Sequence, residues 1–250
     1  MLPDIKVLDY SLLHDKKWKM RKVGLIGGTS WHSTIEYYKE INQRVNHIKG
    51  NRVNPPLLVY NVNQRLINDL QIKDNWDEIL KIYLNASNDL INAGVEAVAL
   101  CSNSAHMIYN RLVEKIKVPV IHIADAIGQK AFSMKINRLG LLGTVYTMES
   151  KFIKRHLQTK YNIEVIVPKS SSYRRIMSII YDELSVGVLK SESQKYVIEE
   201  MRILENNGAE GIILGCTELP MLVKENDFEQ PIFNTISLHC ELITKFILKE

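Results

Sequence analysis

Two residues that follow apolar runs of the sequence have the chemistry for proton transfer. Ser102 follows the run 97–101, and Cys216 follows the run 211–215. We expect each of them near a helix N-terminus, where backbone N–H groups and the helix dipole favour negative charge and can lower the pKa of a thiol. We therefore predict a reactive thiolate at Cys216. The alternative is a buried structural cysteine, and the polar neighbours Thr217 and Glu218 favour the reactive one.

The histidines and the glycine-rich stretches give weaker indications of a functional site. No H-x-x-x-H or carboxylate–histidine spacing occurs, so we expect no metal site. His106 and His239 fall close to the predicted site loops, whereas His122 is typical of an interior histidine. The glycine-rich stretches 24–28 and 140–143 follow apolar runs as phosphate-binding turns do, but their spacing is neither G-x-G-x-x-G nor a Walker loop. Nucleotide binding is therefore not expected.

An internal repeat places the two candidate residues opposite each other. Residues 92–103 (NAGVEAVALCSN) align with 206–217 (NNGAEGIILGCT) at an offset of 114, so that Ser102 aligns with Cys216. Residues 22–29 align with 138–145 at the similar offset of 116. The repeat predicts two similar lobes. Because ligands of open α/β sheets bind beyond the carboxyl ends of the strands, we expect the site in a cleft where the strand ends of the two lobes face each other.

The elements that must hold these loops alternate between strand and helix. Continuous apolar runs are typical of strands covered on both faces, as in a parallel sheet. The predicted strands are 23–27, 57–62, 97–101, 120–123, 139–143, 163–167 and 211–215, and the predicted helices include 33–46, 76–92, 173–184 and 192–206. The alternation predicts an α/β protein with two Rossmann-like lobes and mainly parallel sheets. At the end of the first-lobe strand, alternation of side chains predicts that Cys101 points away from the cleft.

Composition excludes several classes of protein. The 250 residues are 46% hydrophobic and 24% charged, which is typical of a globular protein, and the net charge of +4 is too small and too dispersed to favour nucleic-acid binding. Three cysteines without a C-x-x-C spacing argue against a disulfide framework and for a reducing compartment. No apolar run is long enough for a membrane span. We expect a cytoplasmic protein, with residues 1–19 as a leader of unassigned role.

Four motifs, in order along the chain, resemble those of the aspartate/glutamate racemase family of amino-acid racemases. They are GGTSWHST at 27–34, SNSAH at 102–106, GTVYTM at 143–148 and GCTELP at 215–220. The resemblance extends from about residue 20 to the end of the sequence. Trp31 and Glu218 are more similar to the aspartate racemase branch than to the glutamate racemases.

The resemblance implies a cleft that holds one amino acid between two acid–base residues, with no cofactor. One residue removes the α-proton and the other delivers a proton to the opposite face, while hydrogen bonds stabilise the carbanion. The implied catalytic residues are Cys216 and Ser102. The implied substrate-binding residues are Thr29, Gln71, Asn103, Ser104, Thr144, Thr147, Arg175, Thr217 and Glu218. Among these, Arg175 resembles a basic residue that would meet a side-chain carboxylate.

The sequence departs from the commonest family pattern at Ser102, where a second cysteine is usual. A hydroxyl is a far poorer base than a thiolate, so we hypothesise that Cys216 deprotonates the L-enantiomer of an aspartate- or glutamate-like substrate and that Ser102 returns a proton, favouring the L-to-D direction. Two alternatives remain: a related single-cysteine decarboxylase or isomerase, and a non-catalytic amino-acid-binding protein. The family further implies a homodimer. We predict a first lobe of residues 20–117 plus 230–250, and a second lobe of residues 118–229.

Overall fold

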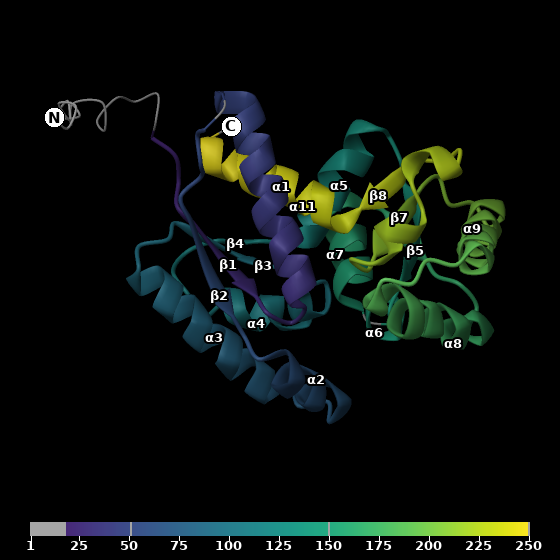
Figure 1. Ribbon diagram of the computed structural model, residues 1–250, viewed down its shortest axis with the longest axis horizontal. Helices are drawn as coiled ribbons and strands as arrows, with labels where there is room; N and C mark the ends of the chain where they lie inside the picture. Colours follow the sequence, from purple (N-terminus) through teal and green to yellow (C-terminus); the bar gives the residue numbers. More distant parts are fainter. Residues whose placement is uncertain (1–18, 51, 150, 250) are drawn as a thin grey trace, which may run out of the picture.

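Two α/β lobes lie side by side in the computed structural model (Figure 1), which describes residues 19–50, 52–149 and 151–249. Each lobe holds a four-stranded, all-parallel sheet. The first sheet has the order β2-β1-β3-β4 and the second has the order β6-β5-β7-β8. The strands are β1 (Val23–Gly27), β2 (Leu57–Asn61), β3 (Ala97–Leu100), β4 (Val120–Ile121), β5 (Arg138–Gly143), β6 (Glu164–Ile166), β7 (Ile212–Gly215) and β8 (Ile232–Asn234). The predicted fold class is confirmed.

Helices cover both faces of each sheet, which explains why the central strands are apolar throughout. The helices are α1 (Trp31–Lys49), α2 (Gln64–Ile72), α3 (Trp76–Asn92), α4 (Tyr109–Val113), α5 (Ile123–Ser133), α6 (Val145–Glu149), α7 (Lys151–Tyr161), α8 (Ser170–Ser178), α9 (Ser191–Asn206), α10 (Leu219–Leu222) and α11 (Thr235–Leu248). In the first lobe α1 and α11 share one apolar core with the sheet, and α2, α3 and α4 share the other. In the second lobe α5 and α7 cover one face, and α8, α9 and α10 cover the other.

The internal repeat corresponds to a repeated structural unit. Glu96 and Glu210, which align in the repeat, both receive backbone hydrogen bonds at the start of the first strand of their lobe. The Glu96 carboxylate accepts from the N–H of Lys22 at 3.1 Å, and the Glu210 carboxylate accepts from the N–H of Asn137 at 2.7 Å. Since the strand orders also correspond, β1 with β5 and β3 with β7, the loops that carry Ser102 and Cys216 occupy equivalent places in the two lobes.

Glycine is required where the first strand turns into α1. Gly28 has a φ of +89°, and a Cβ at this position would lie 2.3 Å from the carbonyl oxygen of Val62. The Gly28 N–H donates to the hydroxyl of Thr34 on α1 at 3.0 Å. The turn therefore passes close to the neighbouring β2–α2 loop, and this presents Thr29 at the carboxyl end of the sheet.

The chain crosses between the lobes later than the sequence predicted. Residues 120–121 were expected in the second lobe, but β4 pairs with β3 of the first sheet. Residues 230–234 were expected in the first lobe, but β8 pairs with β7 of the second sheet. The crossings lie at the starts of α5 and α11, which pack against each other between the lobes (Figure 1). Short strands at the sheet edge carry too little apolar pattern to mark these boundaries from sequence.

The helix predicted over 173–184 consists of three segments. After α8 the chain forms a turn of π-helix, Ile179–Glu183, and then a 3₁₀ turn, Leu184–Val186. The predicted leader, residues 1–19, lies outside the described residues except for Lys19. Within the described ranges, no helix has the length and apolar character needed to cross a membrane.

Candidate active site

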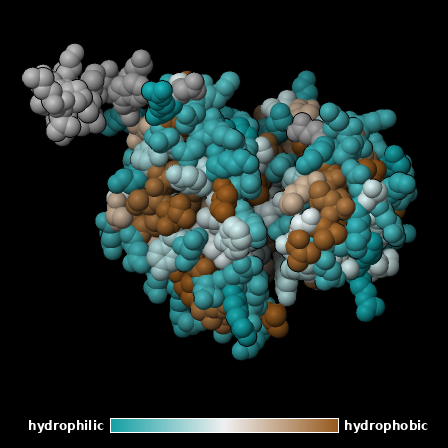
Figure 2. Space-filling model, in the orientation of Figure 1, coloured by the Kyte–Doolittle hydropathy of each residue, from teal (hydrophilic) through white to brown (hydrophobic). Residues whose placement is uncertain are grey.

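A cavity of about 420 Å³ lies between the carboxyl ends of the two sheets and receives side chains from both lobes. A groove between the lobes is visible in Figure 2. Every residue implied by the family resemblance except Arg175 lines this cavity. It is also lined by Ser30, Trp31, His32, Ser33, Gln64, Asn68, Tyr146, Ile180, Tyr181, Ser185 and Gly215.

The first-lobe wall of the cavity is a chain of neutral hydrogen-bonding groups. The Gln71 side chain donates to the Ser104 hydroxyl at 3.1 Å, and the Ser104 and Ser102 hydroxyls are 3.2 Å apart. A hydroxyl that accepts from an amide is free to donate its own proton onward, so Ser104 can donate to Ser102. The Ser102 proton is then available to a molecule in the cavity. Nearby, the Thr29 hydroxyl lies 2.6 Å from the hydroxyl of Tyr83.

On the second-lobe wall, a carboxylate contacts the candidate thiol. The Cys216 Sγ donates to Glu218 Oε2 at 2.7 Å, and the hydroxyl of Thr217 donates to the same oxygen. Two further hydroxyls, those of Thr144 and Thr147, lie 3.2 Å apart on the loop after β5. The wall therefore combines one thiol, one proton acceptor and several hydroxyl donors.

The pKa of Cys216 is shifted opposite to the sequence prediction. Burial and then the adjacent Glu218 carboxylate raise the pKa of the thiol well above its usual value, and backbone hydrogen bonds from Glu218 and Thr217 offset this only in part. The expected effect of a helix N-terminus is small here, because α10 has only four residues. Cys216 is thus a thiol when the cavity is empty, and Glu218 is the group placed to take its proton.

Cys101 lies in the core of the first lobe, as predicted. It is 1% exposed and packs among apolar residues between the first sheet and the α1–α11 layer. Burial raises its pKa. Among the described residues, Cys216 is therefore the one cysteine at the cavity.

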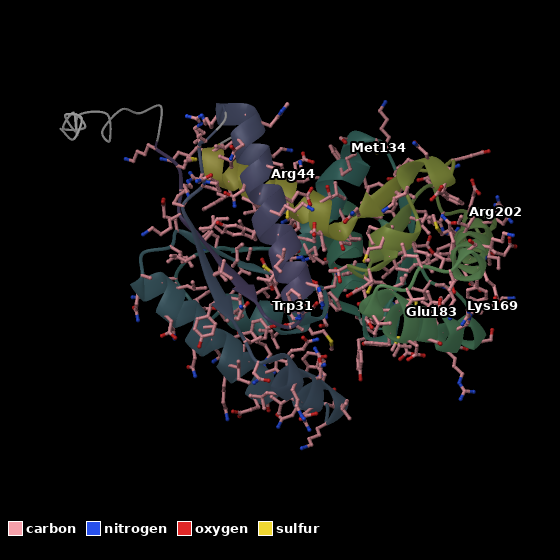
Figure 3. The ribbon with its side chains drawn as sticks, in the orientation of Figure 1. Trp31, Arg44, Met134, Lys169, Glu183 and Arg202 are labelled. Carbon is pink, nitrogen blue, oxygen red and sulfur yellow. The ribbon has the colours of Figure 1, made fainter. Side chains whose placement is uncertain are left out.

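Arg175 lies outside the cavity, contrary to the prediction. Its guanidinium donates to the carboxylate of Glu183 at 3.3 Å and to the Ser193 hydroxyl at 3.2 Å. The Glu183 side chain is only 4% exposed and also contacts Lys190. Figure 3 shows Glu183 in the second lobe, while Trp31 lies at the start of α1 in the first. A buried carboxylate needs cationic and hydrogen-bonding partners, and this requirement holds Arg175 away from the site.

The cavity walls are polar but nearly free of formal charge. Among the described lining residues there is no lysine or arginine, and Glu218 is the one carboxylate. No group of three or more His, Cys, Asp or Glu in the described ranges is arranged to hold a metal ion. A carboxylate of a bound molecule would meet neutral N–H and O–H donors.

Four histidines form a cluster behind the first-lobe wall and do not line the cavity; they are His106, His122, His156 and His239. His106 lies between the Ser102 carbonyl, 2.9 Å from its Nδ1, and the Ile123 N–H, which donates to its Nε2 at 3.2 Å. His239 contacts the Tyr37 hydroxyl and the Ile121 carbonyl. Burial lowers the pKa of His106 to about 4 and that of His239 to about 3. Both are neutral and hold loops at the lobe junction.

Thr235 is a residue near the site that the sequence did not single out. It is fully buried at the start of α11, where its hydroxyl contacts Asn103 and the carbonyl of Leu214. A threonine at a helix start is common, so no sequence signal distinguishes it. Tyr181 and Ser185 were also missed, because Tyr181 lies in the segment 173–184 that was predicted as an ordinary helix and Ser185 directly follows it.

The fold is similar to that of solved structures described as racemases or racemase homologues. A putative Asp/Glu racemase from Yersinia pestis is 36% identical, with a TM-score of 0.88, and the match covers 92% of this chain and all of the other. An aspartate racemase homologue from Pyrococcus horikoshii OT3 is 30% identical, with a TM-score of 0.80 and the same coverage.

Curated proteins described as racemases are also similar to this chain, at lower sequence identity. A glutamate racemase of Limosilactobacillus reuteri is 28% identical over 177 residues, which cover 67% of this chain and 64% of that relative's length. The family model described as Asp/Glu/Hydantoin racemase matches residues 26–243. Because this match covers most of the chain and includes every strand end at the cavity, the chain belongs to the Asp/Glu/hydantoin racemase family.

Proposed function

We propose that the chain is an amino-acid racemase that inverts the α-carbon of aspartate- or glutamate-like substrates without a cofactor. The observation that carries this proposal is the placement of Cys216 and Ser102 on opposite walls of one cavity, each at the end of an equivalent strand. Inversion requires a proton to leave one face of Cα and another to arrive at the opposite face. Two acid–base groups from facing lobes meet that requirement.

In the L-to-D direction the reaction begins at Cys216. Glu218 accepts the thiol proton, and the resulting thiolate removes the α-proton of the L-substrate. The electron pair left on Cα is delocalised into the α-carboxylate, where the hydroxyls of Thr144, Thr147 and Thr217 stabilise the developing charge. Ser102 then donates its proton to the opposite face. The cycle closes when Glu218 releases its proton to solvent and Ser102 regains one from solvent, so no net proton is consumed.

The distal carboxylate of the substrate would be bound by neutral donors. The descriptions of the similar structures suggest aspartate and glutamate as the first candidate substrates. Arg175 is not available to bind their side-chain carboxylate, because it is paired with Glu183. Gln71 presents an amide on the first-lobe wall and takes the role proposed for Arg175. Recognition by neutral donors predicts that dicarboxylic substrates bind without a dedicated ion pair.

The test is a panel of L- and D-amino acids in deuterium oxide, followed by proton NMR of the α-position. We expect deuterium to enter L-aspartate or L-glutamate readily and the D-enantiomer more slowly, because a thiolate is a better base than a serine hydroxyl. Cys216→Ala should abolish exchange from the L-enantiomer. Equal exchange from both enantiomers that survives in Cys216→Ala would contradict the proposal.

A second candidate function is favoured by the single cysteine at the cavity. A decarboxylase needs one proton donor rather than two, and Cys216 could supply it. Incubation with a disubstituted malonate separates the two activities, because release of carbon dioxide without α-exchange of any amino acid would favour the decarboxylase.

A further inference from the structure

Thr235 connects the two catalytic loops through its hydroxyl. The Thr235 Oγ1 donates to the carbonyl oxygen of Leu214 on β7 at 3.0 Å and accepts from the Asn103 Nδ2 at 3.1 Å. Asn103 directly follows Ser102 in the first lobe, and Leu214 precedes Cys216 by two residues in the second lobe. One fully buried side chain therefore joins both walls of the cavity.

The direction of these bonds fixes the orientation of the Asn103 amide. A hydroxyl has a single proton, and a carbonyl oxygen can only accept, so the Thr235 proton belongs to the bond with Leu214. Toward Asn103 the Thr235 oxygen can only accept. Asn103 must therefore turn its NH₂ group to Thr235 and its Oδ1 the other way.

The Oδ1 of Asn103 is buried and has no hydrogen-bond partner among the described residues, while Asn103 as a whole is 7% exposed and lines the cavity. A buried acceptor without a donor costs roughly 1–3 kcal/mol. Asn103 thus holds an unused acceptor at the cavity wall, just beneath its surface. The ammonium group of an α-amino acid is a charged donor that fits, and hydrogen bonds to charged groups are the stronger kind.

We propose that Thr235 is a positioning residue, which orients Asn103 so that its carbonyl oxygen receives the α-ammonium of the substrate. This inference rests on the proposed function, since it names the group that binds the amino nitrogen. Thr235 acts through Asn103 and does not itself line the cavity. The same hydroxyl also sets the spacing between the loop of Ser102 and the strand that leads to Cys216.

The test compares Thr235→Val with Thr235→Ser. Valine keeps the shape but removes the hydroxyl, so Asn103 can rotate and present NH₂ to the ammonium. We expect Thr235→Val to raise the KM of L-aspartate or L-glutamate roughly tenfold or more, with a smaller change in kcat, and Thr235→Ser to stay within about threefold of wild type. Thr244→Val is the matched control, because Thr244 is a buried threonine of the same helix whose hydroxyl donates to the Cys240 carbonyl.

A desamino analogue separates positioning from a general loss of structure. Succinate and glutarate lack the amino group of aspartate and glutamate, so Thr235→Val should leave their inhibition constants within about twofold of wild type. Equal weakening of the amino acid and its desamino analogue would overturn the proposal, as would failure of Thr235→Ser to restore the KM. Thermal melting of each variant reports on folding.

The outcome remains interpretable if wild type catalyses no exchange. The proposed racemase function would then fail, but thermal stabilisation of wild type by L-aspartate or L-glutamate, and its loss in Thr235→Val, would still support the orientation of Asn103. If neither amino acid stabilises the wild-type protein, the inference fails together with the function.

Discussion

The contact between Cys216 and Glu218 has two opposing effects on the thiol. The carboxylate makes the thiolate harder to form, because its charge raises the pKa of Cys216. It is also the nearest group that can accept the thiol proton, at 2.7 Å. These two effects are consistent with a Cys216 thiol that is protonated in the empty cavity. Glu218 would then accept the thiol proton only when substrate fills the cavity.

Replacement of Glu218 separates these two effects. Glu218→Gln removes the negative charge, so the pKa of Cys216 should fall and alkylation of Cys216 by iodoacetamide at pH 8 should become faster. The same change removes the proton acceptor, so α-deuteration of the L-substrate should become slower. Peptide mass mapping identifies the alkylated cysteine, and Glu149→Gln on the exposed surface of α6 is the control. A fall in both rates would contradict the role of Glu218.

Residues at strand ends could be predicted from the sequence, whereas their partners could not. Ser102 and Cys216 were found because each ends an apolar run and the two align in a repeat. Arg175 was misplaced because its partner Glu183 is buried by a helical turn whose type has no sequence signature. The role of Thr235 depends on contacts with two loops that are distant in sequence, so no local pattern reports it.

At the scale of elements, the π-helical turn after α8 sets part of the cavity wall. Ile180 and Tyr181 lie in this turn and line the cavity, while Glu183 at its end contacts Arg175 and Lys190. Turns of π-helix are rare in proteins, and those that occur are often found at functional sites. The extra residue in the turn lets one short segment present side chains both to the cavity and to the core.

The start of α11 is important because it carries Thr235. Asn234 caps this helix by accepting from the N–H groups of Ile236 and Ser237, and Asn75 caps α3 by accepting from the N–H of Glu78. Loss of either cap should cost about 1 kcal/mol of unfolding free energy.

The two cap variants should differ in activity although they are similar in stability. We expect Asn234→Ala to raise the KM of the amino-acid substrate, because the first turn of α11 loosens around Thr235, and Asn75→Ala to leave it unchanged. Urea unfolding and steady-state kinetics on both variants test this. An unchanged KM in Asn234→Ala would show that the helix start is held by its tertiary contacts alone.

Elements in the interior of the fold were predicted well from the sequence. The central strands β1, β3, β5 and β7 and the long helices α1, α3 and α9 lie where continuous apolar runs or helical periodicity placed them. The edge strand β8 was missed, since its three residues are too few to form a recognisable apolar run. Strand pairing and the crossing points depend on contacts across the sheet, which composition does not encode.

At the scale of the whole molecule, a cluster of histidines lies where the lobes meet. His106 follows β3, His122 caps α5, His156 lies on α7 and His239 lies on α11. The rings of His122 and His156 stack with centroids 3.9 Å apart. Burial lowers the pKa of His122, His106 and His239. A proton on any of these three rings would be buried at the junction of the lobes.

Stability should therefore depend on pH through this junction. His106, His122 and His239 are neutral in the fold, but in the unfolded chain they take up protons below about pH 6.5. The unfolding free energy should fall as pH decreases from 6.5 toward 4, by roughly 1.4 kcal/mol per pH unit for each buried histidine. Urea unfolding at pH 7.5, 5.5 and 4.5 measures this, with His47→Gln on the exposed surface of α1 as control. An unfolding free energy that is constant over this range would contradict the prediction.

The position of α11 also bears on how the protein is made. Its side chains Ile236, Cys240, Ile243 and Ile247 complete the core that surrounds Val23 and Leu25 of the first strand, yet α11 follows the entire second lobe in the sequence. During synthesis on the ribosome, the lobe that emerges first must wait for this helix, with one face of its sheet covered only by α1. The second lobe is continuous from α5 to β8, so it can fold before the first lobe does. The order of folding would then be the reverse of the order of translation, and chaperone contacts should concentrate on the partly covered face of β1.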